Sequence, residues 1–515
     1  MFHVIKRNGE TADFTLTKTN DVIMKAFNAT DMETTNDIID LLALRVTADF
    51  QDKVKDGAIH VEDSVEKVLE QAGYTEVAKA YILYRKQREK IRNLKSTILD
   101  YKDVVNSYVK VEDWRVKENS TVTYSVGGLI AVTANYWLSE IYDEEIAEAH
   151  RNADIHIHDL SMLTGYCAGW SLKQLITEGL GGITGKITSA PAAHLSVLCN
   201  QMVNFLGIMQ NEWAGAQAFS SFDTYLAPFV KVDNLTYPEV KKCIESFIYG
   251  VNTPSRWGTQ APFSNITLDW TVPDDLAELP AVVGGKEMDF LYKDCKKEMD
   301  MVNKAFIEIM IEGDANGRGF QYPIPTYSIT RDFDWSDTEN NRLLFEMTAK
   351  YGTPYFSNYI NSDMQPSDVR SMCCRLRLDL RELRKKTGGY FGSGESTGSV
   401  GVVTINMPRI AYLSADKEDF YKRLDKMMDI SARSLKIKRQ VITRLLNEGL
   451  YPYTRRYLGN FDNHFSTIGL IGMNEVGLNA NWLREDMSAE KTQDFTKEVL
   501  NHMRERLADY QEQYG

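Results

Sequence analysis

The sequence predicts an α/β protein in two parts, a small and mainly helical module followed by a much larger mixed domain. From about residue 96 to residue 470, strand-like apolar runs alternate with long helical patterns, which favours helices packed on a sheet. Before residue 96, one short hairpin is followed only by helical periodicity. With 515 residues, the chain is long enough to bury a sizeable core.

The amino-acid composition excludes some classes of function. Hydrophobic residues at 43% and charged residues at 25% are ordinary for a soluble globular enzyme. The net charge of −13 argues against a protein that follows a nucleic-acid backbone, because that task needs clustered Lys and Arg. We therefore expect no nucleic-acid partner.

No stretch predicts a membrane segment. The longest run without Asp, Glu, Lys or Arg is Ile187 to Asn211, but it contains Pro191, His194 and several amide side chains. Lipid would leave these polar groups unpaired, so we interpret the run as an interior helix of a large domain. The first residues carry no apolar core of signal-peptide length, so a cytoplasmic location is expected.

The first module combines a hairpin, short helices and two basic segments. Val4 to Phe14 reads as a hairpin, because Asn8-Gly9 supplies residues that tolerate positive φ. Apolar residues then recur at helical spacing in three segments, at 22–27, 38–44 and 61–69, and a basic helix follows at 81–88. The two basic segments could hold a triphosphate, although on charge alone a solvated surface is the simpler interpretation.

Two histidines mark the start of the large domain. Residues 154–160 alternate in character, which places His156 and His158 on one face of a strand. Such a pair can ligate a metal, but no third ligand is obvious nearby, so a hydrogen-bonded polar pocket is favoured and no metal site is predicted. Cys167 follows among small residues at the predicted end of a strand. The acidic, helix-favouring stretch 273–312 is expected to be peripheral.

The six cysteines form no CxxC pair, which excludes a zinc ribbon and a thioredoxin-like motif. In a cytoplasmic chain they are expected to be reduced thiols. Cys373 and Cys374 are adjacent, between the strand-like run 351–358 and the glycine-rich run 388–394. From the pair alone, two buried small hydrophobes are the favoured interpretation, and a reactive loop is the alternative.

A glycine- and hydroxyl-rich loop follows the cysteine pair. Ser396, Thr397 and Gly398 offer hydroxyl and backbone N–H donors to a phosphate, although the Lys-Ser/Thr ending of a P-loop is missing. The predicted strand 402–405 then delivers Asn406, whose side chain can grip a sugar hydroxyl.

The beginning of the chain resembles the ATP-cone, a regulatory nucleotide-binding module of many ribonucleotide reductases. The likeness rests on the pattern V-x-K-R-x-G-x4-F and on the helices that end near Y-x-x-Y-R. It implies that ATP or dATP binds as an allosteric effector at Val4, Lys6, Arg7 and Gly9. It also implies a regulatory domain at residues 1–95 and a catalytic domain at residues 96–515.

The remainder resembles the anaerobic, glycyl-radical (class III) ribonucleoside-triphosphate reductases over nearly its whole length. The motifs that carry the likeness are His-x-His-Asp (156–159), Tyr-Cys-Ala-Gly-Trp (166–170), the small and aromatic run 211–225, Met-Cys-Cys-Arg-Leu (372–376) and Gly-Val-Val-Thr-Ile-Asn-Met-Pro-Arg (401–409). The resemblance implies a ten-stranded α/β barrel of two five-stranded halves, with a central finger loop. It implies reduction of ribonucleoside triphosphates by thiyl-radical chemistry.

The same resemblance implies roles for individual residues. Cys374 matches the thiyl cysteine that abstracts the 3′ hydrogen, and Cys167 matches the cysteine on the opposite side of the sugar, the hydrogen donor to C2′. Asn406 matches an asparagine that binds the substrate in members that use formate as reductant. His156 and His158 line the same pocket, and the loop 396–398 contacts the substrate.

One departure from the family pattern concerns the radical source. The family carries a four-cysteine zinc site and a loop, R-V-x-G-Y, whose glycine stores the radical, and neither is found in this sequence. We therefore expect zinc and the glycyl radical in a segment outside this sequence, from a truncated part or a separate chain. The resemblance also implies a radical-SAM activase as partner and a homodimer.

Two alternatives stay open at this point. Pyruvate formate-lyase, another glycyl-radical enzyme, also uses adjacent cysteines, so the pair Cys373-Cys374 does not discriminate by itself. The ATP-cone-like start and the His-x-His-Asp segment favour the reductase. A catalytically incomplete nucleotide-binding fragment, which needs a second chain for the radical glycine, is the other alternative.

Overall fold

The computed structural model describes residues 3–5, 11–13, 15–30, 32–51, 61–83, 131–254, 260–362 and 396–514. The chain divides into two compact units, Met1–Lys102 and Asp103–Gly515. Each unit has a hydrophobic core of its own. The two are therefore described separately.

The first unit is a strand pair followed by helices. Strands β1 (His3–Ile5) and β2 (Thr11–Asp13) pair antiparallel with His3 opposite Asp13, which confirms the predicted strand pair. The helices are α1 (Leu16–Asn28), α2 (Asn36–Gln51) and α3 (Val61–Gln71), and residues 75–83 are also helical. Their apolar faces meet in one core. Leu41 and Leu44, two residues of the predicted apolar pattern of α2, are exposed instead.

The second unit is organised by a sheet whose eight strands lie in the described residues. Five strands run parallel in the order β10 (Tyr355–Asn358), β9 (Ile324–Ile329), β6 (Ser264–Leu268), β5 (Gln217–Phe219) and β4 (Cys167–Trp170). Strand β11 (Gly398–Asn406) pairs antiparallel with β4 and parallel with β12 (His464–Ile471). Strand β3 (Ile155–Ile157) pairs antiparallel with β11. The β4–β11 pair thus joins a parallel five-stranded group to a second group.

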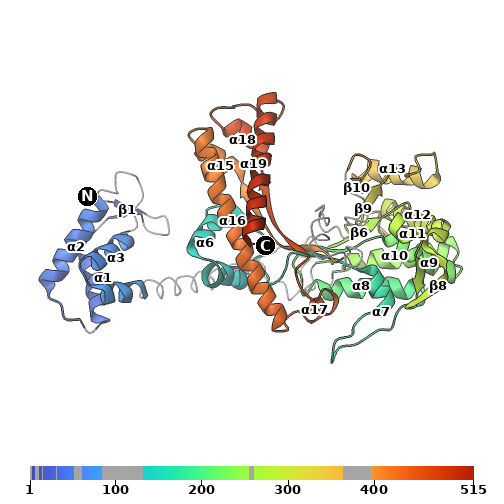
Figure 1. Ribbon diagram of the computed structural model, residues 1–515, viewed down its shortest axis with the longest axis horizontal. Coiled ribbons are helices and arrows are strands. Elements are labelled where there is room, and N and C mark those ends of the chain that lie inside the picture. Colours follow the sequence, from blue (N-terminus) through green and yellow to red (C-terminus); the bar gives the residue numbers. More distant parts are fainter. Residues whose placement is uncertain are drawn as a thin grey trace. The chain divides into compact units, whose positions relative to one another are not determined.

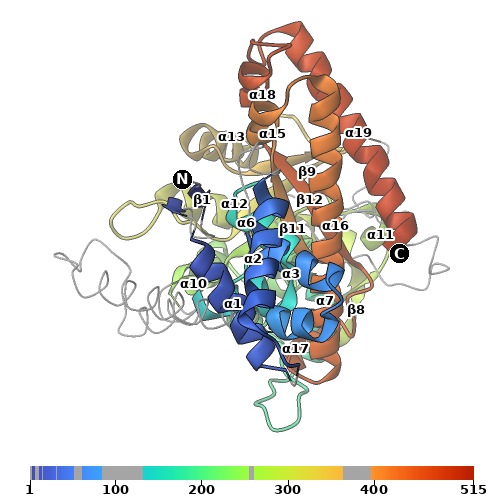
Figure 2. The same cartoon turned by 90° about the vertical axis from the view of Figure 1, so that its left-hand side faces the viewer.

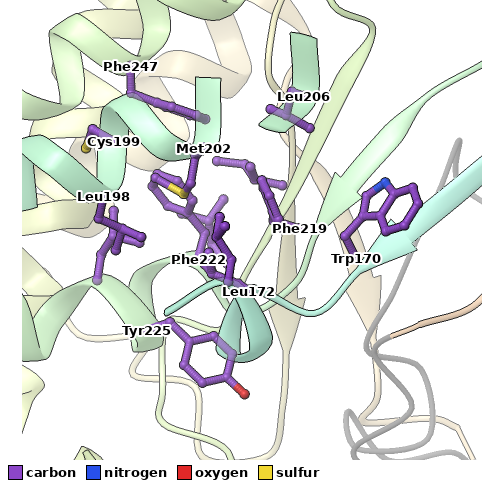
Figure 3. Close-up of a cluster of buried hydrophobic side chains, with 14 of the residues drawn as sticks. Trp170, Leu172, Leu198, Cys199, Met202, Leu206, Phe219, Phe222, Tyr225 and Phe247 are labelled. Atoms are coloured by element: carbon purple, nitrogen blue, oxygen red, sulfur yellow. The ribbon is translucent and has the colours of Figure 1, made fainter. Parts of the chain in front are cut away.

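Helices cover one face of the five parallel strands (Figure 1). They are α7 (Leu172–Glu178), α8 (Leu195–Met209), α9 (Phe222–Val232), α10 (Tyr237–Asn252), α12 (Lys296–Glu312) and α13 (Glu339–Tyr351). Figure 3 shows part of the core beneath them, where Met202 of α8 and Phe222 of α9 meet Phe219 of β5. Parallel strands bury the helix-covered face in this way because each crossover helix packs back onto the sheet.

The acidic stretch 273–312 is not peripheral, contrary to the expectation from its charge. It contains α11 (Asp274–Ala277), the hairpin of β7 (Pro280–Val283) and β8 (Lys286–Leu291), a 3-10 turn (Tyr292–Cys295) and α12. Val302 and Phe306 of α12 are fully buried in the main core. The acidic residues occupy the outer face of α12. A prediction from net charge alone therefore missed the apolar face on the opposite side of the helix.

A second core supports β11, β12 and β3. It is formed by η3 (Trp137–Ile141), α6 (Glu144–Arg151), α15 (Met407–Leu413), α16 (Lys417–Asn447), α18 (Met473–Asn479) and α19 (Glu490–Tyr514). Helix α17 (Pro452–Tyr457) instead joins the main core through Tyr457. In Figure 2, α15 and α18 lie at one end of α16, and α19 runs beside it. Among the described helices, none combines the length and the apolar character needed to cross a bilayer.

A buried carboxylate, Asp223 at the start of α9, ties several elements together. It accepts hydrogen bonds from the backbone N–H groups of Asp269 (2.8 Å) and Trp270 (2.9 Å), directly after β6. It also accepts from Asn303 Nδ2 of α12 (2.9 Å), whose Oδ1 accepts from Tyr327 Oη of β9 (2.9 Å). Burial raises the pKa of Asp223, and these donors oppose that rise. The carboxyl edge of the sheet therefore depends on this one side chain.

We predict that Asp223→Ala lowers the free energy of unfolding by about 3 kcal/mol or more, because each buried donor left unpaired costs about 1–3 kcal/mol. Urea unfolding followed by tryptophan fluorescence measures the change. Asp337→Ala, which removes only an exposed ion pair with Arg342, is the control and should leave the unfolding midpoint in place. Equal midpoints for the two variants would contradict the structural role of Asp223.

Candidate functional site

The pairing of β4 with β11 brings two predicted site segments together. Ala168 lies opposite Gly398, and Cys167 lies opposite Ser399. The backbone N–H of Gly169 donates to Thr397 O (2.6 Å), and that of Tyr166 donates to Ser399 O (3.1 Å). Residues 396–398 therefore lie beside Cys167, although some 230 residues separate them in sequence.

Gly398 is required for this close pairing. A Cβ atom at Gly398 would overlap the carbonyl oxygen of Cys167 and would also meet Ala168 Cα at 2.9 Å. Only glycine lets the two backbones approach this closely. The loop predicted to present its backbone to a ligand thus uses Gly398 to approach another strand.

Cys167 is fully buried, packed with Ala216, Tyr166 and Phe263. It takes part in a disulfide bond, which differs from the expectation that the cysteines are reduced thiols. The sequence carried no information on which sulfurs approach each other in space, so the expectation rested on compartment alone. Three other cysteines of the described residues, Cys199, Cys243 and Cys295, are free thiols as expected.

The sheet face that carries Cys167 is polar. Along β6, Ile266 and Leu268 point into the helix-covered core, so Asn265 and Thr267 lie on the opposite face. The register places Asn265 level with Ala218 and Gly169, the latter two residues after Cys167. Asn265 Oδ1 and Thr267 Oγ1 are buried, and neither has a hydrogen-bond partner among the described residues. Strands of a parallel sheet are usually apolar on both faces, so the polar face indicates a ligand.

His156 and His158 lie on this same face. In the register of β11 with β12, Ser399 pairs with Phe465, and Thr404 pairs with Gly469. Phe465 and Gly469 are four residues apart on β12, so these two positions face the same side of the sheet. Cys167 is opposite Ser399, and His156 is opposite Thr404. This confirms the prediction that alternation places the two histidines on one face.

His158 is held by β11 through both backbone and side chain. Its N–H donates to Val402 O (3.1 Å), and its Nε2 lies 2.8 Å from Thr404 Oγ1. Its ring packs edge-on against Tyr166, with centroids 6.0 Å apart. Burial and His156 lower the pKa of His158, and Asp159 opposes them. The imidazole is therefore held next to the residue that precedes Cys167.

A third histidine, His150 of α6, belongs to the group and was missed from the sequence. Its Nδ1 accepts the N–H of Ile157 (3.1 Å), and its ring lies 5.4 Å from that of His156, between centroids. Burial, His156 and Arg151 lower the pKa of His150. It precedes His156 by six residues on a different element, so no helical or strand periodicity could have signalled the contact.

Lys438 of α16 is a buried cation behind this group. Its side chain packs against Gly401 of β11, and within the described ranges its ammonium has no hydrogen-bond partner. Burial lowers the pKa of Lys438 to about 8, opposed by Asp159. Lys438 also contributes to the lowered pKa of His158.

The structure does not bring Asn406 together with Cys167. Asn406 pairs with Ile471, six residues along β12 from the partner of Ser399, which is about 20 Å of strand. Its Nδ2 donates to Ala153 O (2.9 Å), and its Oδ1 caps α15 by accepting from Arg409 N (3.2 Å). These contacts give Asn406 a helix-capping role, and the predicted role at the substrate has no support from the geometry.

Several predicted site residues fall outside the described part of the chain. Cys374 and its neighbour Cys373 lie there, as do Lys6, Arg7 and Gly9. Val4, the remaining residue of the predicted effector site, lies in β1 opposite Ala12. The effector-site assignment stays a prediction.

A cavity of about 510 Å³ opens at the carboxyl edge of the parallel strands. It is lined by Asp269 after β6, Ser328 and Thr330 at the end of β9, Tyr359 after β10, and further residues of 271–275 and 331–332. Ligands of parallel sheets often bind at this edge. The lining contains four aspartates and one arginine, so a triphosphate without a cation would be repelled. Groups of three or more metal-capable side chains are absent from the described residues.

We predict that Gly398→Ala separates β4 from β11 at Cys167, because the overlap with the Cys167 carbonyl forces one backbone to move. The expected cost is about 1–3 kcal/mol of unfolding free energy, measured by urea denaturation. Gly207→Ala on α8 is the matched control, since a Cβ there meets nothing within 4 Å. A Gly398→Ala protein as stable as the Gly207→Ala protein would contradict the close pairing.

Comparison with known families and structures agrees with this geometry. Residues 118–515 match the family described as anaerobic ribonucleoside-triphosphate reductase, and residues 2–90 match the ATP cone domain. The anaerobic ribonucleoside-triphosphate reductase of Haemophilus influenzae is 23% identical over 484 residues, covering 87% of this chain and 64% of that protein. The chain thus spans less than two thirds of the length of this curated relative.

Solved structures of the anaerobic ribonucleotide reductase from Thermotoga maritima share the fold. The structure with citrate in the active site is 23% identical, with a TM-score of 0.64, and covers 83% of this chain and 81% of that one. The complex with dATP and CTP is 21% identical, with a TM-score of 0.63, and covers 83% and 75%. The predicted fold class, a barrel of this type preceded by an ATP-cone, is confirmed. The chain belongs to the anaerobic ribonucleoside-triphosphate reductase family.

Proposed function

We propose that this chain carries the substrate-binding and thiol-bearing part of an anaerobic reductase that converts ribonucleoside triphosphates to deoxyribonucleoside triphosphates. The observation that carries the proposal is the β4–β11 pair, which sets Cys167 beside the loop 396–398 on a polar sheet face. Family membership supports the same reaction class. A pyruvate formate-lyase-like activity gains no support from the family matches.

The proposed chemistry divides between two cysteines. A thiyl radical at Cys374 abstracts the 3′ hydrogen, which weakens the C2′–O bond, and the 2′ hydroxyl leaves as water. Cys167 delivers a hydrogen atom to C2′ from the opposite side of the sugar. A disulfide has no S–H to give, so Cys167 acts only after reduction. Formate restores the electrons and leaves as carbon dioxide.

The polar face and the glycine-rich loop bind the substrate in this proposal. Ser396 and Thr397 donate hydrogen bonds to the ribonucleotide next to Cys167. Thr267 Oγ1 and Asn265 Oδ1, both without partners, contribute further polar contacts. His158, held against Thr404, lies near the leaving oxygen.

The remaining partners follow from the family. A glycyl radical supplies the unpaired electron for Cys374 and is formed by a radical-SAM activase, and zinc belongs to the segment that carries that glycine. The catalytic unit assembles as a homodimer. ATP or dATP binds the first unit through Val4, Lys6, Arg7 and Gly9 and regulates turnover, and the boundary between the two domains lies near residue 95.

We predict that Cys374→Ser and Cys167→Ser each abolish reduction, because serine forms no stable radical and donates no hydrogen atom. The assay measures deoxyribonucleotide formation anaerobically, with thiol reductant, formate, activase and the glycine loop, on the same or a separate chain. Cys373→Ser is the matched control and should retain substantial activity. If Cys373→Ser were inactive and Cys374→Ser active, the two roles would be exchanged.

The same protein separates the rival functions. Binding of pyruvate or coenzyme A without affinity for ribonucleoside triphosphates would support a lyase. Binding of ribonucleoside triphosphates without any turnover under the full assay would support a catalytically incomplete nucleotide-binding protein. Deoxyribonucleotide formation excludes both.

For the first unit, we predict that Lys6→Ala and Arg7→Ala weaken ATP and dATP binding by about tenfold to a hundredfold each. A charge-assisted hydrogen bond to a phosphate is worth about 1.5–3 kcal/mol. Calorimetry on the full chain measures the dissociation constants. Lys18→Ala, at an exposed position of α1, is the control and should bind as the unchanged chain does. Unaltered affinity in all three variants would place the effector elsewhere.

A further inference from the structure

The three histidines form a continuous row that runs from the exposed side of β3 toward Cys167. Ring centroids are 5.4 Å apart between His150 and His156, and 4.6 Å apart between His156 and His158. The ring of Tyr166, directly before Cys167, follows at 6.0 Å from His158. At these spacings one water molecule can bridge the nitrogens of neighbouring rings.

Exposure falls from the middle ring toward Cys167, because His156 is exposed, His158 is half-buried, and Cys167 is fully buried. His150, on the other side of His156, is half-buried. His158 is hydrogen-bonded to Val402 of β11. In the register of β11 with β12, Val402 pairs with Thr467, and Ser399 pairs with Phe465. Those two residues are about 7 Å apart along β12, so the inner end of the row lies about 7 Å along the sheet from the level of Cys167. The row therefore connects solvent with the proposed reaction site.

Hydrogen bonds fix the two half-buried rings of the row. Because Nδ1 of His150 accepts the N–H of Ile157, the proton of the neutral ring is on Nε2. The backbone of Ile155 is a further hydrogen-bond partner of this ring. His158 Nε2 is bound to Thr404 Oγ1, so Nδ1 is the nitrogen of His158 that takes up the proton and hands it on.

From this geometry we propose that the row His150–His156–His158 carries protons from solvent to the 2′ oxygen of the bound ribonucleotide. The inference rests on the proposed function and deepens it by assigning the proton supply. His158 is the donor that contacts the substrate, and His156 and His150 are relay residues that act through it. None of the three has been given this role by sequence reasoning.

The reaction needs such a supply because it consumes one proton per turnover with formate. The C2′–O bond breaks, and the oxygen leaves as water with its own hydrogen and the delivered proton. Formate loses its hydrogen and two electrons and becomes carbon dioxide, while C2′ gains a hydrogen in place of the hydroxyl. The sum is ribonucleotide, formate and one proton on one side, and deoxyribonucleotide, carbon dioxide and water on the other.

The cations near the row favour the neutral forms of His150 and His158. Arg151 lies beside His150, and Lys438 of α16 and Asp159 flank His158. On the same strand face, Asp154 is engaged by Arg409 at 2.7 Å. Burial adds to the effect of these cations and lowers the pKa of His150 and His158. Neutral imidazole is the form that can accept a proton and then release it.

A metal site is the competing use of three histidines, and the geometry argues against it. His150 Nδ1 is occupied by a backbone N–H, and its Nε2 carries the ring proton when neutral. Groups of three metal-capable side chains do not occur in the described ranges.

The test compares His156→Ala with the unchanged protein in the reduction assay. His156 is exposed, so its removal leaves the core intact. We expect kcat to fall by about a hundredfold, the usual worth of a positioned proton donor, with KM unchanged. Added imidazole should restore much of kcat. Without imidazole, kcat of the variant should fall as pH rises from 6 to 8, because protons then come only from solvent, whereas the unchanged protein should show a flatter profile.

Two further variants complete the design. His150→Gln should show a smaller loss with the same imidazole response, and His194→Ala on α8, whose exposed ring pairs with Asp233, should behave as the unchanged protein. Full kcat in His156→Ala, or a loss that imidazole does not restore and that raises KM, would overturn the relay. If the unchanged protein forms no deoxyribonucleotide at all, the proposed function fails instead, so the two failures are distinguishable.

Discussion

The arrangement of the site depends on the antiparallel pairing of β4 with β11. In the described residues, this is the strand pair through which the five parallel strands meet β11, β12 and β3. Its contact surface is short, with Ala168 and Cys167 opposite Gly398 and Ser399. The absence of a side chain at Gly398 is what lets the two backbones approach. The loop 396–398 and His156 take their positions relative to Cys167 from this pair, whereas Asn265 is placed through β5.

The two faces of the parallel strands carry different kinds of side chain. The helix-covered face is packed with large side chains such as Trp170, Phe219 and Tyr327, which supply the burial that stabilises the unit. The opposite face carries small and polar side chains and leaves the oxygens of Asn265 and Thr267 unpaired, which costs free energy. That cost is tolerated where a bound molecule supplies the missing partners, so the sheet separates stability and binding onto opposite faces.

Local patterns in the sequence predicted those structural features that depend on residues close together in the chain. Alternation placed His156 and His158 on one face, and the strand before Asn406 was found where expected. Contacts across long separations could not be predicted in this way. His150 reaches His156 from a different element, and Asn406 turned out to cap α15, about 20 Å of strand away from the level of Cys167.

Predictions of burial from the sequence failed in two helices, α12 and α2. Helix α12 lies in an acidic stretch yet buries Phe306, because its acidic residues occupy only the outer side. On α2, Leu41 and Leu44 are exposed, whereas Leu42 and Val46 are buried, since the helix has more apolar positions than its single core contact can cover. The family motifs were informative because they combine residues that no single periodicity links.

The electrostatic setting explains why histidines, rather than carboxylates, suit the polar face near Cys167. A carboxylate placed beside Lys438 would be held ionised by the buried ammonium and would keep its proton affinity too low to transfer a proton. An imidazole beside the same cation is pushed the other way, toward its neutral form. Asp159 limits this effect on His158, so the ring keeps enough basicity to accept a proton from His156. Burial and His156 are the larger causes of the lowered pKa of His158, and Asp159 and Lys438 adjust that pKa in opposite directions.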